Sequence, residues 1–406
     1  MLALFASGTA GAVEPATLTA PLRLEQVLEI AHDHRAEIVA AHARARAFGQ
    51  RPAIVSALED PMISPAIDHL PYMFEGADTS VTVEQRFPLS RVRGNRRRVA
   101  KADAQRALAD AGKVELEVEL DAASAFLMLQ ERREMARILI EERALAEQFV
   151  RAATARYAAG SGTHADALRA EIEVARFDAS LRSSAADVRG AEFMLATSLG
   201  LPAETPIPAL DGTIAATPPP DAAVVQDAAL SRRPELHAGS AEILGAKAEV
   251  RVMRSMYLPM AMVRTGPAYT MTDGKGWMVM VGISVPLWRG KLRAGVAEAE
   301  AMQSMAEADL AGMRRMIEGE SLAAREQVVG SRERYLALRD EIIPRARQAI
   351  DPTLAGYSSG QLPLVSVIDA AQTLWSSQAD LVSAQFDLGL AWARLHRAMG
   401  NEGARP

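Results

Sequence analysis

Apolar residues recur along the first half of this chain at two different spacings. In residues 22–58, 91–159 and 163–199 they return every three or four positions, which predicts three α-helices. In residues 60–69 and 79–87 they alternate with polar residues, which predicts two strands. The predicted order is therefore a helix, a β-hairpin, a long helix and a return helix.

The second half of the chain repeats this order of predicted elements. The corresponding segments are a helix over 221–257, strands over 259–269 and 277–285, a long helix over 291–358 and a return helix ending at Met399. Pro52 is expected to break the first helix weakly, and Pro344 and Pro352 are expected to bend the second long helix.

Short sequence motifs recur at the same spacing as the predicted elements. Arg35-Ala36-Glu37-Ile38 returns as Arg233-Pro234-Glu235-Leu236, an offset of 198, and Tyr157 with Gly160 returns as Tyr357 with Gly360, an offset of 200. A nearly constant offset indicates duplication of a whole structural unit. The predicted divisions are a partial signal peptide over 1–12, a first repeat over 22–200, a linker over 201–220, a second repeat over 221–400 and a tail over 401–406.

The first long helix carries two apolar stripes. One stripe begins at Leu116 and the other at Val118, so the two lie about 200° apart around the helix axis. A helix of this length, about 100 Å, with apolar residues on opposite sides has a neighbour on each side. We therefore expect the long helices to form a wall and not the outer layer of a globule.

In the predicted strands, odd-numbered positions are mostly apolar. Polar residues and methionines occupy the even positions: Ser64, Asp68, Glu84, Arg86, Met260, Met262, Arg264, Met278 and Met280. Each strand has about nine residues, the length that crosses a bilayer when tilted. One interpretation places the odd face against lipid and the even face toward a water-filled lumen, with the sheet closed by further copies of the chain. The alternative is a soluble four-stranded sheet packed on helices.

Composition and motifs exclude several classes of protein. The net charge of −6 argues against nucleic acid as the main partner, and the absence of cysteine excludes disulfides and thiolate metal sites. No run of eighteen apolar residues predicts a membrane-spanning helix. The sequence contains no nucleophile elbow, P-loop, His-Glu-x-x-His or dinucleotide fingerprint, so we expect neither an enzyme nor a cofactor. His32-Asp33-His34 suggests a metal site, but these histidines point apart on a helix and fit a solvated face better.

An ordered set of landmarks makes the chain resemble the TolC-like outer-membrane efflux proteins. They are Leu24-Glu25-Gln26-Val27-Leu28, Phe87-Pro88-Leu89, Arg156-Tyr157 with Gly160, Asp166-Ala167-Leu168, Val285-Pro286-Leu287-Trp288, Tyr357 with Gly360, and Val367-Ile368-Asp369-Ala370. The resemblance implies a mainly α-helical fold with a membrane β-barrel part, in which a homotrimer forms a twelve-stranded β-barrel and a twelve-helix α-barrel reaching across the periplasm.

The resemblance also implies a function and partners. It indicates a passive exit channel in the outer membrane that works with a periplasmic adaptor and an inner-membrane pump of the RND type. A heavy-metal branch of the family would export cations such as Cu and Ag or Co, Zn and Cd. Two other functions stay open at this point: the outer-membrane channel of type I protein secretion, and a soluble coiled-coil scaffold or adaptor.

The resemblance places the two helix-to-helix turns at periplasmic tips that contact the adaptor and narrow the pore. The tip residues are Arg156, Tyr157, Gly160, Asp166, Tyr357, Gly360, Ser366 and Asp369. Asp369 would form a carboxylate ring in a trimer or would be an ordinary solvated helix residue. Ser366 stands where relatives often carry a second acid, so a double ring is not expected.

Two further clusters have both a functional and an ordinary interpretation. Five arginines follow the second strand, namely Arg91, Arg93, Arg96, Arg97 and Arg98. They fit the boundary between membrane lipid and water, or they are ordinary charge on a helix surface. The methionines on the even strand face suit soft metal ions, but packing or lining is the favoured interpretation.

Overall fold

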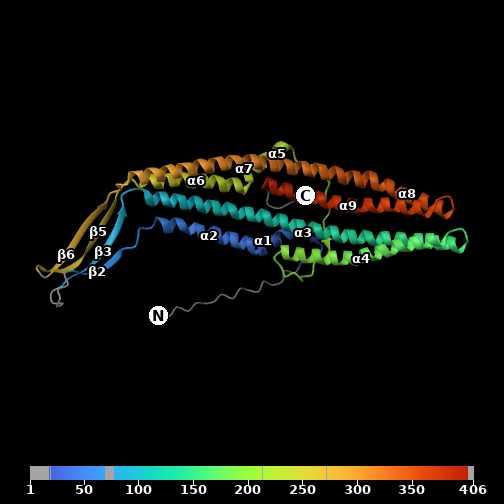
Figure 1. The fold of residues 1–406 in the computed structure, drawn as a ribbon, viewed down its shortest axis with the longest axis horizontal. Helices are drawn as coiled ribbons and strands as arrows, with labels where there is room; N and C mark the ends of the chain where they lie inside the picture. The colour runs from blue at the N-terminus through green and yellow to red at the C-terminus, as the bar shows by residue number, and fades with distance from the viewer. Residues whose placement is uncertain (1–17, 19, 69–76, 213, 271, 401–406) are drawn as a thin grey trace. The chain divides into compact units, whose positions relative to one another are not determined.

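The computed structural model describes residues 18, 20–68, 77–212, 214–270 and 272–400 of the chain (Figure 1). The predicted signal segment and tail lie outside these residues. The chain divides into two compact units. The first unit comprises Met1–Ile38, Glu115–Arg232 and Ile317–Pro406, and the second comprises Val39–Val114 and Arg233–Met316.

Two helices, and not one, precede the β-hairpin in each repeat. The first pair is α1 (Leu24–His34) and α2 (Ala36–Ser56), and the second is α5 (Ala222–Arg232) and α6 (Pro234–Ser255). The prediction of continuous helices over 22–58 and 221–257 is therefore wrong, and so is the expected break at Pro52, which lies inside α2.

The breaks between the paired helices fall at Arg35 and Arg233, the arginines that begin the repeated sequence motif. Arg35 and Arg233 both have extended backbones, with ψ of 121° in each case. At Arg233 the cause is local, because the ring of Pro234 disfavours the helical conformation of the residue before it. At Arg35 the guanidinium donates a hydrogen bond of 2.9 Å to the Ser198 carbonyl, which holds the break against the end of another helix.

The long helices follow the prediction closely. In the first repeat α3 covers Val92–Ala158 and α4 covers His164–Ser198. In the second repeat the long helix consists of α7 (Arg289–Ala337), a π-helical segment (Leu338–Ile342) and α8 (Ile343–Ser358), followed by α9 (Leu364–Met399). The π-helical segment ends two residues before Pro344, as expected near a residue that cannot donate the regular backbone hydrogen bond. Pro352 lies inside α8 without ending it.

The second unit contains a four-stranded antiparallel sheet with the order β2-β3-β5-β6 (Figure 1). The strands are β2 (Met62–Asp68), β3 (Asp78–Pro88), β5 (Met260–Thr270) and β6 (Gly274–Ser284). Strand β6 begins three residues before the predicted start at Trp277, because Thr270 pairs with Gly274 and closes a tighter turn. Every paired position joins two even or two odd residues, so the predicted parity becomes two real faces of one sheet.

The first unit also contains a short parallel pair of strands that the sequence did not predict. These are β1 (Leu22–Arg23) and β4 (Leu210–Asp211), and β4 lies within the segment interpreted as a plain linker. Each strand has two residues, which is too short for any alternation to appear in the sequence.

Both apolar stripes of α3 are buried within the first unit. Leu116 and Leu127 of one stripe and Val118 and Leu129 of the other are each at most 5% exposed. Farther along the unit, an aromatic cluster joins α3, α4 and α9, with the Phe177 and Trp375 rings 4.8 Å apart in an edge-to-face arrangement. The helix therefore has packed neighbours on two sides, as the two stripes predicted. Among the described helices, none combines the length and the apolar character needed to cross a membrane.

Candidate functional site

The two tip turns of the first unit share one backbone design. Gly160 follows α3 with φ of 71°, and Gly360 follows α8 with φ of 82°, a region that favours glycine because it lacks a Cβ. The amides of Ser161 and Gly162 donate to the Arg156 carbonyl, each at 3.0 Å, and those of Gln361 and Leu362 donate to Gly356 at 2.8 and 3.0 Å. Both glycines therefore make the chain reversals predicted for them.

Arg156 joins the two tips. Its guanidinium donates to the Tyr357 carbonyl at 2.6 Å and to the Ser161 carbonyl at 2.8 Å. The same guanidinium lies over the Tyr357 ring, 4.7 Å from the ring centroid. One side chain thus holds a carbonyl from each turn and the face of an aromatic ring, an arrangement that favours arginine over lysine.

The equivalent tyrosines of the two repeats have different environments. Tyr157 is 50% exposed and packs on His164, with the ring centroids 5.3 Å apart, whereas Tyr357 is 1% exposed. Burial raises the pKa of Tyr357 above its ordinary value, and the negative charge of Asp166 raises it further, while Arg156 opposes the shift. The structure therefore brings Arg156, Tyr357 and Asp166 together at one tip, which spacing in the sequence did not show.

The acidic candidates lie at the starts of the return helices. Thr163 caps α4 by accepting a hydrogen bond of 3.2 Å from the amide of Asp166, which lies in the first turn. Ser366 lies in the first turn of α9 and is half-buried, and Asp369 is exposed one turn later. Asp369 therefore has the solvent access that a carboxylate ring needs, and its ring role stays a prediction.

The odd face of the sheet in the second unit is apolar and open to solvent. Its exposed side chains cover all four strands: Ile63 and Ile67 on β2, Val81, Val83 and Phe87 on β3, Tyr269 on β5, and Trp277, Val279, Val281 and Ile283 on β6. Val281 is 74% exposed and Val279 is 66% exposed. Soluble monomers seldom leave so continuous an apolar surface uncovered.

The even face carries the polar residues and the methionines. Glu84 lies opposite Arg264 in the β3–β5 pairing and is 4% exposed. Its carboxylate accepts a hydrogen bond of 3.0 Å from the Arg264 Nε and one of 3.1 Å from the Arg86 Nε. The sheet is thus polar on its more covered face and apolar on its open face, the reverse of a soluble domain.

The predicted cluster of five arginines divides into different roles. The Arg93 guanidinium donates to the Ser56 carbonyl at 2.9 and 2.6 Å, at the end of α2. Arg98 donates to the Asn95 side chain at 2.8 Å, whose amide donates to the Arg251 carbonyl at 3.1 Å. Arg91, Arg96 and Arg97 are exposed. Two members therefore brace local structure, and the membrane-boundary role stays a prediction.

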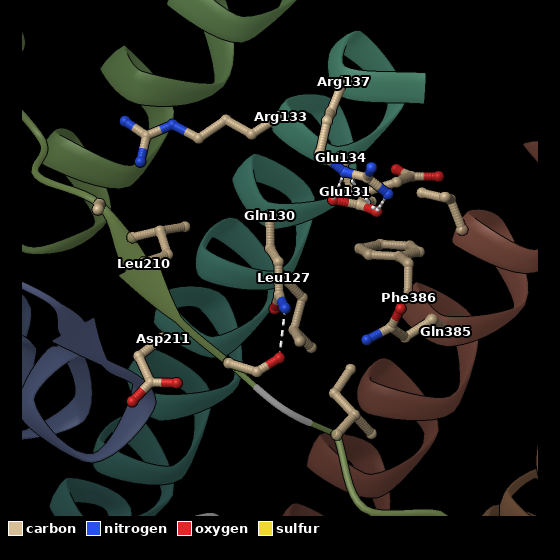
Figure 2. Close-up of a pocket in the computed structure, with 14 residues that line it drawn as sticks. Leu127, Gln130, Glu131, Arg133, Glu134, Arg137, Leu210, Asp211, Gln385 and Phe386 are labelled. Atoms are coloured by element: carbon tan, nitrogen blue, oxygen red, sulfur yellow. Dashed lines mark hydrogen bonds and ion pairs between the residues drawn. The ribbon is translucent and has the colours of Figure 1, made fainter. Parts of the chain in front are cut away.

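A cavity of about 610 Å³ lies where the linker crosses α3 and α9 in the first unit (Figure 2). The Arg133 guanidinium donates to the carbonyls of Ile207 and Pro208 at 2.9 and 2.6 Å and pairs with Glu192 at 2.7 Å. The Gln130 amide donates to the Gly212 carbonyl, as the dashed line in Figure 2 shows. These contacts attach the linker to α3. These contacts could not be predicted from the sequence, because the accepting groups are backbone carbonyls more than 70 residues away.

The described residues contain no group of three or more His, Asp or Glu side chains placed to hold a metal ion. His32 and Asp33 are exposed, and the His34 ring contacts the Ile30 carbonyl at 3.1 Å. This agrees with the interpretation of His32-Asp33-His34 as part of a solvated helix face.

Comparison with known proteins gives matches in sequence and in fold. The family described as outer membrane efflux protein matches residues 225–401. The cobalt-zinc-cadmium resistance protein CzcC of Cupriavidus metallidurans is 27% identical over 58% of this chain and 56% of its own length. The outer membrane efflux protein BepC of Brucella suis is 25% identical over 69% of this chain and 62% of its own length. The matched part thus spans less than two thirds of either relative.

The fold is also that of a solved channel. The structure of the outer-membrane channel OprN has a TM-score of 0.80 against this chain, at 20% identity, and covers 94% of this chain and 91% of the channel. At this level of identity, the likeness establishes the fold.

Proposed function

We propose that this chain, which matches the outer membrane efflux protein family over residues 225–401 and has the fold of a solved outer-membrane channel, forms the passive exit channel of a tripartite efflux system. In this proposal the protein lies in the outer membrane, and its helices extend into the periplasm. The channel lets solutes pass and supplies no chemistry of its own.

One observation carries the proposal, namely the four-stranded sheet with its apolar face open and its polar face partly covered. Strands β2 and β6 are the two edges of the sheet, and unpaired edges are not tolerated inside a bilayer. Four strands are too few to close a barrel alone, whereas three chains would supply about twelve. We therefore propose a homotrimer whose odd face contacts outer-membrane lipid and whose even face lines a lumen.

The tips are the proposed contact for the adaptor and the pump. Arg156 ties the second turn to the first, so separation of the two turns has to break its contacts with Tyr357. We propose that binding of the partner proteins at these tips opens the periplasmic end. The exposed Asp369 would then form one carboxylate per chain near the entrance.

The choice of cargo is proposed to lie in the pump and not in this chain. Heavy-metal export has support from the name of one relative, a cobalt-zinc-cadmium resistance protein. The residues of this chain add no further support for metal export, because the described part contains no group of metal ligands.

Adjacent residues on opposite faces of β3 provide the test. Val81 belongs to the odd face and is 48% exposed, whereas Ser80 belongs to the even face and lies opposite Ala66 and Ala268. An arginine facing lipid costs roughly 2–4 kcal/mol per chain near the bilayer midplane. Val81→Arg is expected to abolish the heat-modifiable trimer in outer-membrane fractions, while Ser80→Arg is expected to keep it, because small neighbours and water surround that position.

The opposite ranking of the two variants would show that the faces are assigned backwards. A wild-type chain that stays monomeric in buffer without detergent would refute the channel and favour the soluble scaffold.

A further inference from the structure

A second cavity, of about 310 Å³, lies inside the second unit at the base of the sheet. Its walls come from the end of α2, the start of α3, the end of α6, and the ends of β3, β5 and β6 that meet these helices. We name it the arginine cavity, after its lining residues Arg86, Arg93 and Arg96. Its volume is within the range of sites that bind small organic molecules.

The polar part of the arginine cavity is strongly basic. Three guanidinium groups line it, and Glu59 is the one carboxylate among the described lining residues. Arg86 is paired with Glu84 at 3.1 Å, so the positive charge offered to a ligand comes mainly from Arg93 and Arg96. Arg93 holds its place through the Ser56 carbonyl, a neutral acceptor, and therefore keeps its full charge. Arg96 is exposed. Its charge acts on the nearby Glu249 carboxylate, but the two groups form no salt bridge within the described residues, so Arg96 can still donate to a ligand. The first turn of α3, which begins at Val92, adds the positive end of a helix.

The other part of the arginine cavity is apolar. Leu58, Met256, Leu258 and Met260 line it, and Leu258 is 53% exposed. Methionine side chains adapt to ligands of different shape, because they are unbranched and polarizable. A basic end beside an adaptable apolar wall matches a molecule that carries a negative group on an apolar body.

The geometry points to the arginine cavity as a binding site for small organic anions with an apolar body, such as aromatic sulfonates or carboxylates. Guanidinium groups bind such anions through paired, charge-assisted hydrogen bonds, and they repel a bare metal cation. Arg86, Pro88, Met260 and Ser284 belong to the even face of the sheet. The proposed function makes this face the wall of the lumen, so a role of the arginine cavity in handling cargo rests on that proposal. Binding of an organic anion to the arginine cavity does not rest on it.

Equilibrium binding of three matched probes tests this inference. The purified full chain in phosphatidylcholine nanodiscs is titrated calorimetrically with naphthalenesulfonate, neutral naphthalenemethanol and cationic naphthylmethylammonium, with empty nanodiscs subtracted. Naphthalenesulfonate is expected to bind at least tenfold more tightly than either other probe. Arg96→Gln is expected to weaken the binding of naphthalenesulfonate about tenfold, which is the effect of losing one charge-assisted contact.

Arg97→Gln is the matched control, because Arg97 is the next residue of the same helix, is exposed and does not line the arginine cavity. Leu258→Ser tests the apolar wall and is expected to weaken the binding of naphthalenesulfonate several-fold. Trimer content and helical circular dichroism of each variant confirm that it is folded.

Equal binding of the three probes would overturn the inference, and so would an effect of Arg97→Gln as large as that of Arg96→Gln. Displacement of naphthalenesulfonate by added phosphatidylglycerol would also overturn it, in favour of a lipid site. Single-channel conductance of the same wild-type preparation separates the two proposals. A conducting channel that does not bind the probe refutes only the arginine cavity, and binding without conductance refutes only the channel.

Discussion

Arg156→Gln is expected to loosen the second tip of the first unit, which is the turn at Gly360. Wild-type Arg156 donates to the carbonyls of Tyr357 and Ser161 and lies 4.7 Å from the centroid of the Tyr357 ring. A glutamine in its place keeps a polar side chain but loses the charge, the second carbonyl contact and the stacking on the ring.

The size of the effect follows from these contacts. A hydrogen bond from a charged donor contributes about 1.5–3 kcal/mol, and a cation–π contact about 0.5–1 kcal/mol at an exposed site. Arg156 is half-buried, so the loss is discounted for solvent to about 2 kcal/mol. That free energy corresponds to an increase of about 30-fold in local opening of the second turn.

Hydrogen exchange of the purified protein measures this opening. The Gln361 and Leu362 amides bond to the Gly356 carbonyl and are expected to exchange about 30-fold faster in Arg156→Gln. Arg156→Lys is expected to be intermediate, because an ammonium keeps the charge without the planar fork. Arg151→Gln, an exposed position on the same helix, is the control and is expected to leave exchange unchanged.

Unchanged exchange in Arg156→Gln would refute the reasoning, since it would show that other contacts hold the second turn. If the channel proposal is also correct, the same variant is expected to show a higher open probability in planar bilayers. The exchange result does not depend on that proposal.

Two further predictions concern stability and assembly. Glu142 on α3 is 6% exposed, and burial, with a smaller contribution from Glu141, raises its pKa to about 7. The folded state then holds this proton more tightly than the unfolded state, so stability is expected to fall, by at most about 4 kcal/mol, as pH rises from the unfolded pKa near 4.3 to about 7. Thermal melts near pH 5 and near pH 8 are expected to show this loss in wild type but not in Glu142→Gln; equal losses would contradict the assignment. Gly266→Ala is expected to disrupt the pairing of β3 with β5, because the added Cβ would overlap the Val81 carbonyl and lie 2.9 Å from the Thr82 Cα. Gly276→Ala, which has open space, is expected to fold normally, and equal yields of folded protein from both variants would count against the strand register.

The periodicity of the sequence predicted most of the elements because their causes are local. The long helix over 91–159 appears as Val92–Ala158, and the two turns appear at Gly160 and Gly360. The parity of the strands was also correct, since side chains of a strand alternate whatever surrounds it. One of the two errors had a local cause, whereas the break at Arg35 is held by the Ser198 carbonyl, 163 residues away. The breaks at Arg35 and Arg233 were missed, although Pro234 was a visible signal for the second of them.

The repeat, the order of helices and hairpins, and the division of strand residues into an apolar and a polar set all follow from the amino-acid sequence. These features depend on neighbours a few residues apart, where backbone sterics and helical or strand periodicity decide the outcome. Contacts between residues that are far apart in the chain depend on how the elements pack, and they became visible in the three-dimensional structure. Arg156 reaches the carbonyl of a residue 201 positions away, Glu84 lies opposite Arg264, and Arg133 attaches the linker. The equivalent tyrosines Tyr157 and Tyr357 differ in burial for the same reason: burial is set by the elements packed around a side chain, and the repeated sequence motif does not contain them.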